Sequence, residues 1–178
     1  MTNTRLSFVG LAVKTSIVHT LTYFVMGWLA ATFFDYASLF AQPYFAGYMR
    51  PTSDLLVLVG PALQPIRGLI FAMAFYPLRE IFFGKKWGWL IMGWTLVALG
   101  ILSTFGPPPG SVEGLLYTVV PVWVQLRGWL EVVPQALLLS ALVYYWVNHP
   151  EKKWLNWVFG IAFALIYGLL TLGLLVGR

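Results

Sequence analysis

Residues 87–106 read WGWLIMGWTLVALGILSTFG, an uncharged run of 20 residues. A helix needs about 20 mainly apolar residues to cross a lipid bilayer, so this run predicts a membrane-spanning helix. The PPPG that follows at 107–110 predicts a tight turn, because proline cannot continue a helix and glycine favours turns. The other apolar stretches lie on both sides of this run, at residues 15–34, 55–78, 112–147 and 154–176.

These stretches predict an all-α, polytopic transmembrane helix bundle with five spans. The stretch 112–147 would measure about 54 Å as one helix, which is too long for a straight span. It contains Pro121 and Pro134, and we expect both to break it. The first apolar run continues to Phe34, which exceeds the about 7–15 residues of a signal-peptide core, so it is assigned to the first span. Residues 35–54 are predicted to be an outer loop with a short interfacial helix.

The composition also indicates a membrane protein. Hydrophobic residues make up 60% of the 178 residues and charged residues 10%, and the mean hydropathy is +0.79. A soluble domain has about 45–50% apolar and about 25% charged residues, so the totals exclude a soluble enzyme, a disordered chain and a nucleic-acid-binding domain. The sequence has no cysteine, which excludes thiolate nucleophiles, iron–sulfur clusters and cysteine-bound zinc. No metal or other cofactor is predicted.

The basic residues predict how the protein is oriented. The net charge is +5, and loops on the cytoplasmic side of membrane proteins carry an excess of Lys and Arg. The bias predicts an integral protein of the cell or inner membrane, with its N-terminus in the cytoplasm and its C-terminus outside. The residues on the predicted cytoplasmic side are Arg5, Lys14, Arg79, Lys85, Lys86, Lys152 and Lys153, and those on the other side are Arg50 and Arg178.

A tandem repeat is predicted within the chain. PALQPIRG at 61–68 resembles PVWVQLRG at 121–128, and the prolines, arginines and glycines of the two motifs are each 60 positions apart. KKW at 85–87 and again at 152–154 extends the resemblance. Two spans in each copy predict parallel repeats, related by an axis along the membrane normal. The single integral membrane domain 1–178 then comprises a first span with its outer loop (1–50), repeat one (51–106) and repeat two (107–178).

Each repeat begins with an acidic helix start. Asp54 and Glu113 favour the positive end of a helix, so we predict that they cap helices; a cation-attracting vestibule is the alternative. Pro61 and Pro121 follow and predict proline-broken half-helices at the outer side, either interfacial or re-entrant. A broken helix leaves carbonyl groups that must find donors when they lie in lipid.

Arg67 and Arg127 each lie six residues after a break and are the main ligand candidates. An intramembrane charge costs at least about 2.5–3.5 kcal/mol, so two such guanidinium groups predict a site for a carboxylate, a phosphate headgroup or an inorganic anion. The alternative is that each arginine donates to the carbonyl groups of its own broken helix. Gln64 and Gln125 are predicted either to line a pore or to bind the same backbone.

A polar stripe continues from Arg127. Glu131 and Gln135 follow at intervals of four residues, which places all three on one helix face. The stripe predicts a polar pathway or a proton-carrying site at membrane depth; the alternative is an ion pair that neutralises Arg127. His19 lies inside the first span and is predicted to be a proton relay or a hydrogen-bonded interhelical residue.

Three functions remain open from the sequence. The repeat, the broken helices and the arginines favour a channel, a transporter or a protein that binds an anionic ligand. Small size and the absence of a catalytic motif favour a non-catalytic accessory subunit of a larger membrane complex. The third function is a lipid- or isoprenoid-processing enzyme with Glu131, His19 or Glu113 as acid or base, although a non-enzyme is favoured. Expected partners are membrane lipids, further copies of the chain or other membrane subunits, and not nucleic acid.

Overall fold

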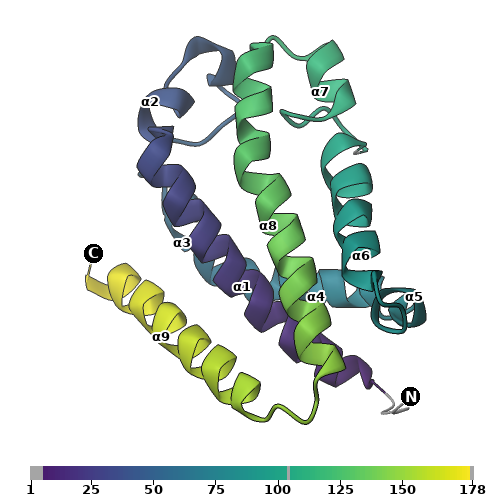
Figure 1. Ribbon diagram of the computed structural model, residues 1–178. Helices are drawn as coiled ribbons and strands as arrows, with labels where there is room; N and C mark the ends of the chain where they lie inside the picture. The colour runs from purple at the N-terminus through teal and green to yellow at the C-terminus, as the bar shows by residue number, and fades with distance from the viewer. Residues whose placement is uncertain (1–5, 104, 177–178) are drawn as a thin grey trace.

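The computed structural model describes residues 6–103 and 105–176, and every regular element within these ranges is a helix (Figure 1). Four helical segments are long and apolar enough to cross a membrane, and a fifth apolar helix is shorter. The chain is therefore all-α and has the character of a small polytopic membrane protein. The four long segments are Phe8–Phe33, Leu55–Phe75, Val122–Asn148 and Trp154–Gly173, and the shorter one is Gly88–Leu102.

The first half of the chain forms one straight and one bent helical segment. Its elements are α1 (Phe8–Phe33), α2 (Tyr36–Phe40), η1 (Pro43–Phe45), α3 (Leu55–Val59), η2 (Gly60–Leu63) and α4 (Gln64–Phe75). Ser7 caps α1, because its side-chain oxygen accepts the amide of Gly10 at 3.1 Å. Asp35 caps α2 in the same way by accepting the amide of Ser38, so the chain turns directly after α1.

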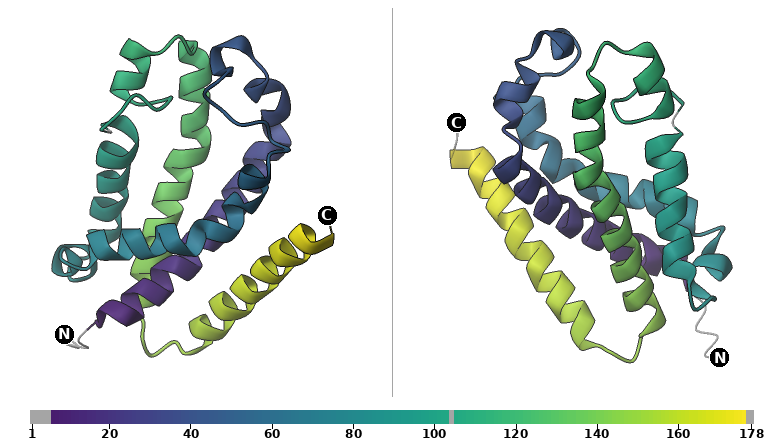
Figure 2. Two further views of the ribbon diagram at one scale, coloured as in Figure 1. Left: turned by 180° about the vertical axis from the view of Figure 1, so that it is seen from behind. Right: turned by 45° about the horizontal axis from the view of Figure 1, so that its top comes forward.

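The second half adds two long helices and one shorter helix. Its elements are α5 (Arg79–Phe83), α6 (Gly88–Val97), η3 (Ala98–Leu102), α7 (Val112–Tyr117), α8 (Val122–Asn148) and α9 (Trp154–Val176). The bounds of α9 match the predicted span 154–176 at both ends. The views in Figures 1 and 2 show α6 and α8 running side by side, with α4 crossing behind α1 and α8.

Five full spans were predicted, and four helical segments are long enough to be full spans. The run 87–106 was expected to form one 20-residue helix, but α6 has 10 residues and continues only through the five-residue π-helix η3. At the rise of an α-helix, the two elements together are about 22 Å long. The hydrocarbon core of a bilayer is about 30 Å thick, so this segment is too short to cross it as a straight helix. The amide of Ser103 donates to the Ala98 carbonyl at 3.0 Å and closes the last wide turn.

The prolines act differently from one another. Pro61 lies in the 3₁₀ turn η2, so α3, η2 and α4 form a continuous bent segment and no separate half-helix. Pro121 follows an extended residue, Thr118 (φ −112°, ψ 154°), and does separate α7 from α8. The expectation that Pro134 breaks the chain is wrong, because Pro134 lies inside the continuous 27-residue helix α8. The loss of one amide donor is tolerated there because neighbouring helices support α8 on both sides.

The closest helix crossing joins α1 to α4. A Cβ atom added to Gly68 would lie within 3 Å of the Ser16 backbone, so only glycine permits this approach. The Ser16 hydroxyl donates to the Pro65 carbonyl at 3.0 Å in the same crossing. This carbonyl belongs to the first turn of α4, so the crossing and the bend at Pro61 support each other.

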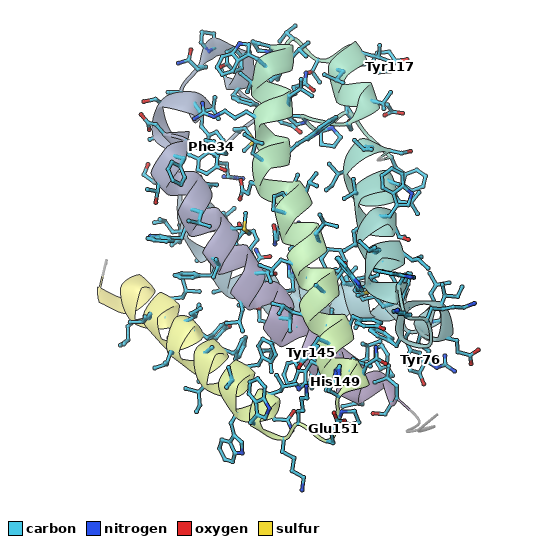
Figure 3. The ribbon with its side chains drawn as sticks, in the orientation of Figure 1. Phe34, Tyr76, Tyr117, Tyr145, His149 and Glu151 are labelled. Carbon is cyan, nitrogen blue, oxygen red and sulfur yellow. The ribbon has the colours of Figure 1, made fainter. Side chains whose placement is uncertain are left out.

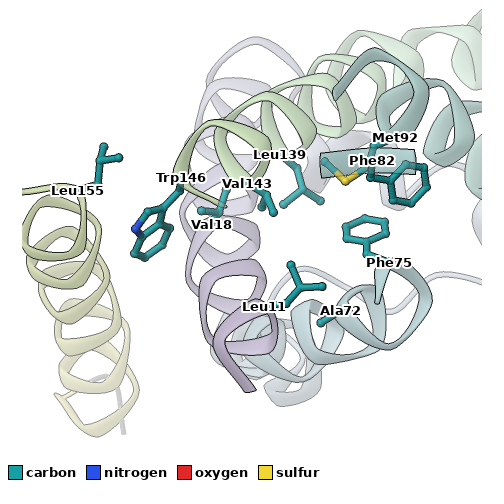
Figure 4. Packing of buried hydrophobic residues seen from close by; sticks show 10 residues of the cluster. All are labelled: Leu11, Val18, Ala72, Phe75, Phe82, Met92, Leu139, Val143, Trp146 and Leu155. Atoms are coloured by element: carbon teal, nitrogen blue, oxygen red, sulfur yellow. The ribbon is translucent and has the colours of Figure 1, made fainter. Parts of the chain in front are cut away.

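The main hydrophobic core lies where α1, α4, α6 and α8 converge (Figure 4). Phe75 and Phe82 meet edge to face with ring centroids 5.6 Å apart, and Met92 and Leu139 are almost fully buried beside them. A smaller cluster lies at the opposite end of the molecule and consists of Phe45, Val120 and Val124. The main cluster comprises Leu11, Val18, Ala72, Phe75, Phe82, Met92, Leu139, Val143, Trp146 and Leu155.

The last helix stands apart from the other four. α9 packs against α1 and η2, and Figures 1 and 2 show it diverging from the remaining helices. Trp146 stacks on Phe159 at 4.6 Å near the start of α9, and the Tyr167 hydroxyl donates to the Ala62 carbonyl at 3.2 Å. The outward face of α9 is exposed and apolar, and includes Trp157, Ile161, Leu165, Leu169 and Leu172.

The two ends of the molecule carry the residues used to predict orientation. Tyr76 and Glu151 lie at one end, and Phe34 and Tyr117 lie at the other (Figure 3). The turns that carry Arg79 and Lys152 are therefore at the same end. Arg5 and Arg178 also entered the orientation prediction, but they lie outside the described residues.

We predict that Gly68→Ala lowers the stability of the protein. The added methyl group would overlap the Ser16 backbone, and overpacking of this kind costs about 1–3 kcal/mol. Gly128→Ala is the matched control, because the predicted repeat aligns Gly128 with Gly68 and a Cβ atom at Gly128 has nothing within 4 Å. The unfolding temperature in detergent should fall for Gly68→Ala and stay level or rise for Gly128→Ala. Equal temperatures for the two variants would contradict the tight crossing.

Candidate functional site

A cavity of about 250 Å³ lies between α1, α4, α6, η3 and α8. We call it the inner cavity. Its polar lining residues come from three different helices: His19 from α1, Arg67 from α4 and Gln135 from α8. The structure thus brings together three residues that the sequence singled out separately. The rest of the wall is apolar or small and consists of Phe71, Leu96, Gly100, Ile101, Val132, Ala136 and Leu139.

Gln64 organises the polar side of the inner cavity. Its Nε2 donates to the Gly60 carbonyl at 2.9 Å, which fixes the direction of the amide group. Its Oε1 then accepts from His19 Nε2 at 3.0 Å and from Arg67 Nη1 at 3.4 Å. His19 must therefore carry its proton on Nε2, as assigned from this hydrogen-bond network. One buried amide connects the histidine of α1 to the arginine of α4.

His19 retains an unused acceptor. The residue is 2% exposed, and its Nδ1 has no hydrogen-bond partner among the described residues. Thr15, one helical turn earlier, is fully buried and also has an unpartnered hydroxyl group. The His19 ring packs edge to face against Phe71, with centroids 5.0 Å apart. Two unsatisfied polar groups in one buried patch are costly, so this part of α1 is well suited to a further polar contact.

The charge of Arg67 has no carboxylate partner in the described structure. Its guanidinium lies 6.0 Å from the centroid of the Tyr23 ring, and no described acid lies within 4 Å of it. The residue is exposed, so one side of the guanidinium is open. The arginine therefore presents unused donors to the inner cavity.

Arg127 does not join Arg67. It lines a second, larger pocket of about 490 Å³ near α2, which we call the outer pocket. Its guanidinium donates to the Phe33 carbonyl at 3.2 Å and lies 4.3 Å from the centroid of the Phe34 ring. Arg127 thus binds the open carbonyl end of α1 and not the break in its own helix. The outer pocket is lined by Asp35, Ser38, Leu39, Gln42, Tyr44, Pro121, Trp123 and Arg127.

Glu131 lies between the two cavities and has no ion pair in the described structure. Its carboxylate accepts a short hydrogen bond from the hydroxyl group of Tyr36, which is on α2. Gly27 of α1 lies beside it, and a Cβ atom there would make only an ordinary contact with Glu131 Oε1, at 4.0 Å. The ion pair of Glu131 with Arg127, which the sequence offered as the alternative to a polar pathway, is not formed, since both side chains turn to partners around the end of α1.

The stripe on α8 therefore connects two separate pockets. Arg127 lines the outer pocket, Gln135 lines the inner cavity, and Glu131 is covered by Tyr36 between them. Eight residues separate the first and last members, which corresponds to about 12 Å along a helix. The sequence missed Tyr36, because a tyrosine after the end of a span carries no signal of a contact 95 positions away.

Burial and Glu131 both act on the phenol of Tyr36, which lies outside the helices that are long and apolar enough to cross a membrane. Burial raises the pKa of Tyr36, and the hydrogen bond to the Glu131 carboxylate raises it further. The negative charge of Glu131 acts in the same direction. The folded protein therefore favours the protonated phenol, and its contribution to stability is lost as the pH rises above the ordinary tyrosine value of about 10.

Gln125 lies outside both cavities. It is 1% exposed and holds the loop before α8 together. Its Oε1 accepts the amide of Gly110 at 3.0 Å, and its Nε2 donates to the Val120 carbonyl at 2.8 Å and the Gly114 carbonyl at 3.2 Å. Gln64 and Gln125 thus both bind backbone near a proline, the role that the sequence offered as an alternative to lining a pore.

Of the two acidic residues at the outer helix starts, Asp54 caps its helix as predicted, whereas Glu113 does not, because Ser111 takes the N-cap position. Asp54 caps α3 by accepting the amide of Leu56 at 2.8 Å and also pairs with Arg50 at 3.0 Å. These two hydrogen bonds, the amide first, lower the pKa of Asp54. Glu113 lies in the first turn of α7 and is exposed, while Ser111 is the N-cap. Glu113 lines neither cavity, so it is not assembled with His19 or Glu131.

Comparisons with protein-family models, with curated proteins and with solved structures found no match. Inferences about function therefore rest on the inner cavity, the outer pocket and the polar contacts between them. Among the described residues, no group of three or more His, Cys, Asp or Glu side chains is arranged to hold a metal ion.

We predict that Glu131→Gln lowers the pKa of Tyr36. The carboxylate and its charge are removed, while the burial that dominates the shift remains, so the pKa should fall but stay above its ordinary range. Titration followed by NMR of tyrosines labelled with carbon-13 at Cζ measures it, with Tyr36→Phe to assign the signal. Tyr145→Phe is a control at the opposite end of the molecule. An unchanged Tyr36 titration in Glu131→Gln would show that the pair is not formed.

Proposed function

We propose that this is an integral membrane protein with five membrane-crossing segments that binds a small amphipathic anion in the inner cavity and passes it across the membrane. The observation that carries the proposal is the open, unpaired guanidinium of Arg67 in a cavity with otherwise mostly apolar walls. An uncompensated charge at membrane depth is costly, so such arginines mark ligand sites more often than passive structure. A carboxylate or phosphate group would supply the missing counter-charge.

The size and lining of the cavity limit the ligand. An apolar cavity of about 150 Å³ holds benzene, so the inner cavity has room for a group of about ten non-hydrogen atoms. Arg67 and Gln135 offer donors to an acidic head, and Leu96, Ile101 and Leu139 offer apolar contact to a short hydrocarbon portion. A medium-chain carboxylate, an alkyl phosphate or the head region of an acidic lipid has this chemistry.

The site is arranged before a ligand arrives. Gln64 is held by the Gly60 carbonyl and in turn holds both His19 and Arg67. A guanidinium that is already oriented loses little freedom when it binds an anion. The polar groups therefore favour recognition of a planar or tetrahedral oxyanion over a diffuse attraction.

The polar stripe of Arg127, Glu131 and Gln135 on α8 supports transport in addition to binding. The outer pocket and the inner cavity share this helix face, and Tyr36 and Glu131 separate them. A carrier needs a binding site, a second compartment and a barrier between the two, and the candidates for these parts are the inner cavity, the outer pocket and the contact of Tyr36 with Glu131. α2 carries the barrier residue, and this helix of five residues is short enough to move independently of the spans.

We predict that Arg67→Met weakens binding of octyl phosphate and octanoate by at least about tenfold, the loss expected for one charge-assisted hydrogen bond. Calorimetric titration of the protein in phosphatidylcholine nanodiscs measures the affinity, with empty nanodiscs as the blank. Arg127→Met is the matched control, because it removes an equal charge from the outer pocket alone. Arg67→Lys should recover part of the affinity.

Two results of this titration would contradict the proposal. One is equal affinity in the wild type and in Arg67→Met. The other is an equal loss in Arg67→Met and Arg127→Met, which would indicate a general effect of net charge. Unfolding temperatures for each variant separate lost binding from lost structure.

An accessory subunit is the second candidate, and α9 is the observation that favours it. α9 diverges from the other helices and leaves a long apolar face without a protein neighbour (Figure 2). A helix of another membrane chain could pack along this face. Such a partner would bury the exposed row of large side chains that Ile161, Leu165 and Leu169 form.

If the protein is an accessory subunit, a partner chain should be retained in fixed ratio on mild extraction and lost in Leu165→Trp/Leu169→Trp. Both changes keep the face apolar, so insertion is preserved while packing is disturbed. The control is Ile66→Trp/Ile70→Trp, which alters an equally exposed row on α4. Native mass spectrometry of the extract reads the ratio. Recovery of the chain alone, or equal loss of the partner in both double variants, would argue against this function.

A further inference from the structure

Two lysine pairs that are distant in the sequence lie together at one end of the molecule. Tyr144, near the end of α8, donates to the Lys85 carbonyl at 3.0 Å and also contacts the Lys86 carbonyl at 3.2 Å. These hydrogen bonds tie the turn between α5 and α6 to α8. The next residue, Tyr145, accepts a hydrogen bond from Lys152 Nζ at 2.5 Å. Consecutive tyrosines thus hold both lysine pairs at the end of α8.

The four lysines, Lys85, Lys86, Lys152 and Lys153, form what we call the lysine face. None of them lies within 4 Å of a carboxylate in the described structure. Two of them rest on aromatic rings instead: Lys86 Nζ is 5.6 Å from the Trp87 ring centroid and Lys152 Nζ is 4.7 Å from that of Tyr145. An ammonium over a ring is oriented but not neutralised, so each remains available to an external anion.

The surroundings of the lysine face add to its positive charge. Lys14 belongs to the same end, because its Nζ donates to the Trp146 carbonyl at 3.1 Å. Arg79 lies over the Tyr76 ring at 4.6 Å, beside the same turn. The acids described at this end are Glu80 and Glu151, and both are exposed. The net field at this end is therefore strongly positive.

Exposed tryptophans adjoin the lysine face. Trp87 directly follows one lysine pair and is 59% exposed, and Trp154 directly follows the other and is 55% exposed. Tryptophan with exposed ring area is typical of the level of lipid headgroups, where an apolar ring and a polar N–H are both satisfied. The rings place the lysines at the height of lipid phosphates, with apolar helix faces below them for acyl chains.

From this placement we infer that the lysine face is a binding site for the phosphate headgroups of anionic phospholipids. The lysines come from two turns, so headgroups bound there would lie across the end of α8. Each basic residue near an anionic lipid surface strengthens the attraction between the protein and that surface about fivefold, and salt screens the effect over about 10 Å at 0.1 M. The inference depends on membrane insertion but not on a ligand in the inner cavity.

The test is the lipid composition that the purified protein retains. Protein reconstituted in nanodiscs of phosphatidylcholine and phosphatidylglycerol is transferred to detergent, and the bound lipids are counted by native mass spectrometry. The wild type should retain phosphatidylglycerol at several times its proportion in the bilayer. Replacing all four lysines of the face by glutamine should return the ratio to that of the bilayer, and replacing them by arginine should preserve the enrichment.

Matched controls separate a local site from total charge. Lys85→Gln/Lys86→Gln and Lys152→Gln/Lys153→Gln should each remove part of the enrichment. Arg50→Gln/Arg127→Gln removes two charges that do not belong to the lysine face and should remove none. The inference is overturned if the fourfold glutamine variant keeps the wild-type ratio, or if the control pair loses as much as a lysine pair. Unfolding temperatures establish that each variant is folded.

A further experiment tests whether the ligand of the lysine face is a lipid headgroup or free phosphate. Inorganic phosphate is added to the reconstituted protein and compared with sodium chloride at the same ionic strength. Equal release of phosphatidylglycerol by the two salts supports a headgroup site that responds only to screening. Selective release by phosphate would overturn the lipid assignment in favour of a soluble phosphate ligand.

Discussion

The close crossing of α1 over α4 is the contact on which the rest of the structure depends. Gly68 lets the Ser16 backbone approach, and the Ser16 hydroxyl binds the Pro65 carbonyl in the same place. This approach brings His19 within reach of Gln64, and Gln64 then orients Arg67. A wider crossing would separate these three side chains, because they come from two helices that meet nowhere else so closely. The close packing of Gly68 against Ser16 therefore also determines where the Arg67 guanidinium lies.

The sequence predicted the helices well where apolar length alone decides them. The span 154–176 is reproduced as α9, and the long apolar stretches reappear as helices. It was less successful at Pro61, Pro121 and Pro134, which it treated as equivalent breaks. The structure contains a tight turn, a true separation and an uninterrupted helix at these positions. A proline removes one donor wherever it lies, but neighbouring packing decides whether the helix ends, and a single sequence does not contain that information.

The candidate site was also predictable from the sequence only in part. His19, Arg67 and Gln135 could be named individually, since a polar side chain in an apolar run is visible in the sequence. Their common cavity could not be predicted, because it depends on how steeply α4 crosses the other helices. The supposed equivalence of Arg67 and Arg127 also concealed a difference. Arg67 faces a cavity within the helices, whereas Arg127 satisfies the last carbonyl of α1 beside the outer pocket. Whether the two halves are a true repeat stays a prediction.

The detached position of α9 has a consequence for biosynthesis. Every helix that lines the inner cavity ends at or before Asn148, and among the described side chains Leu155 is the one member of the main core that α9 contributes. A nascent chain that has left the ribosome through α8 therefore already contains all the surfaces that the first four spans bury against one another. The final helix can then be added beside surfaces that are already complete. Its attachment along Trp146 and Ala62 is a late and local event, and this helix can separate again without opening the others.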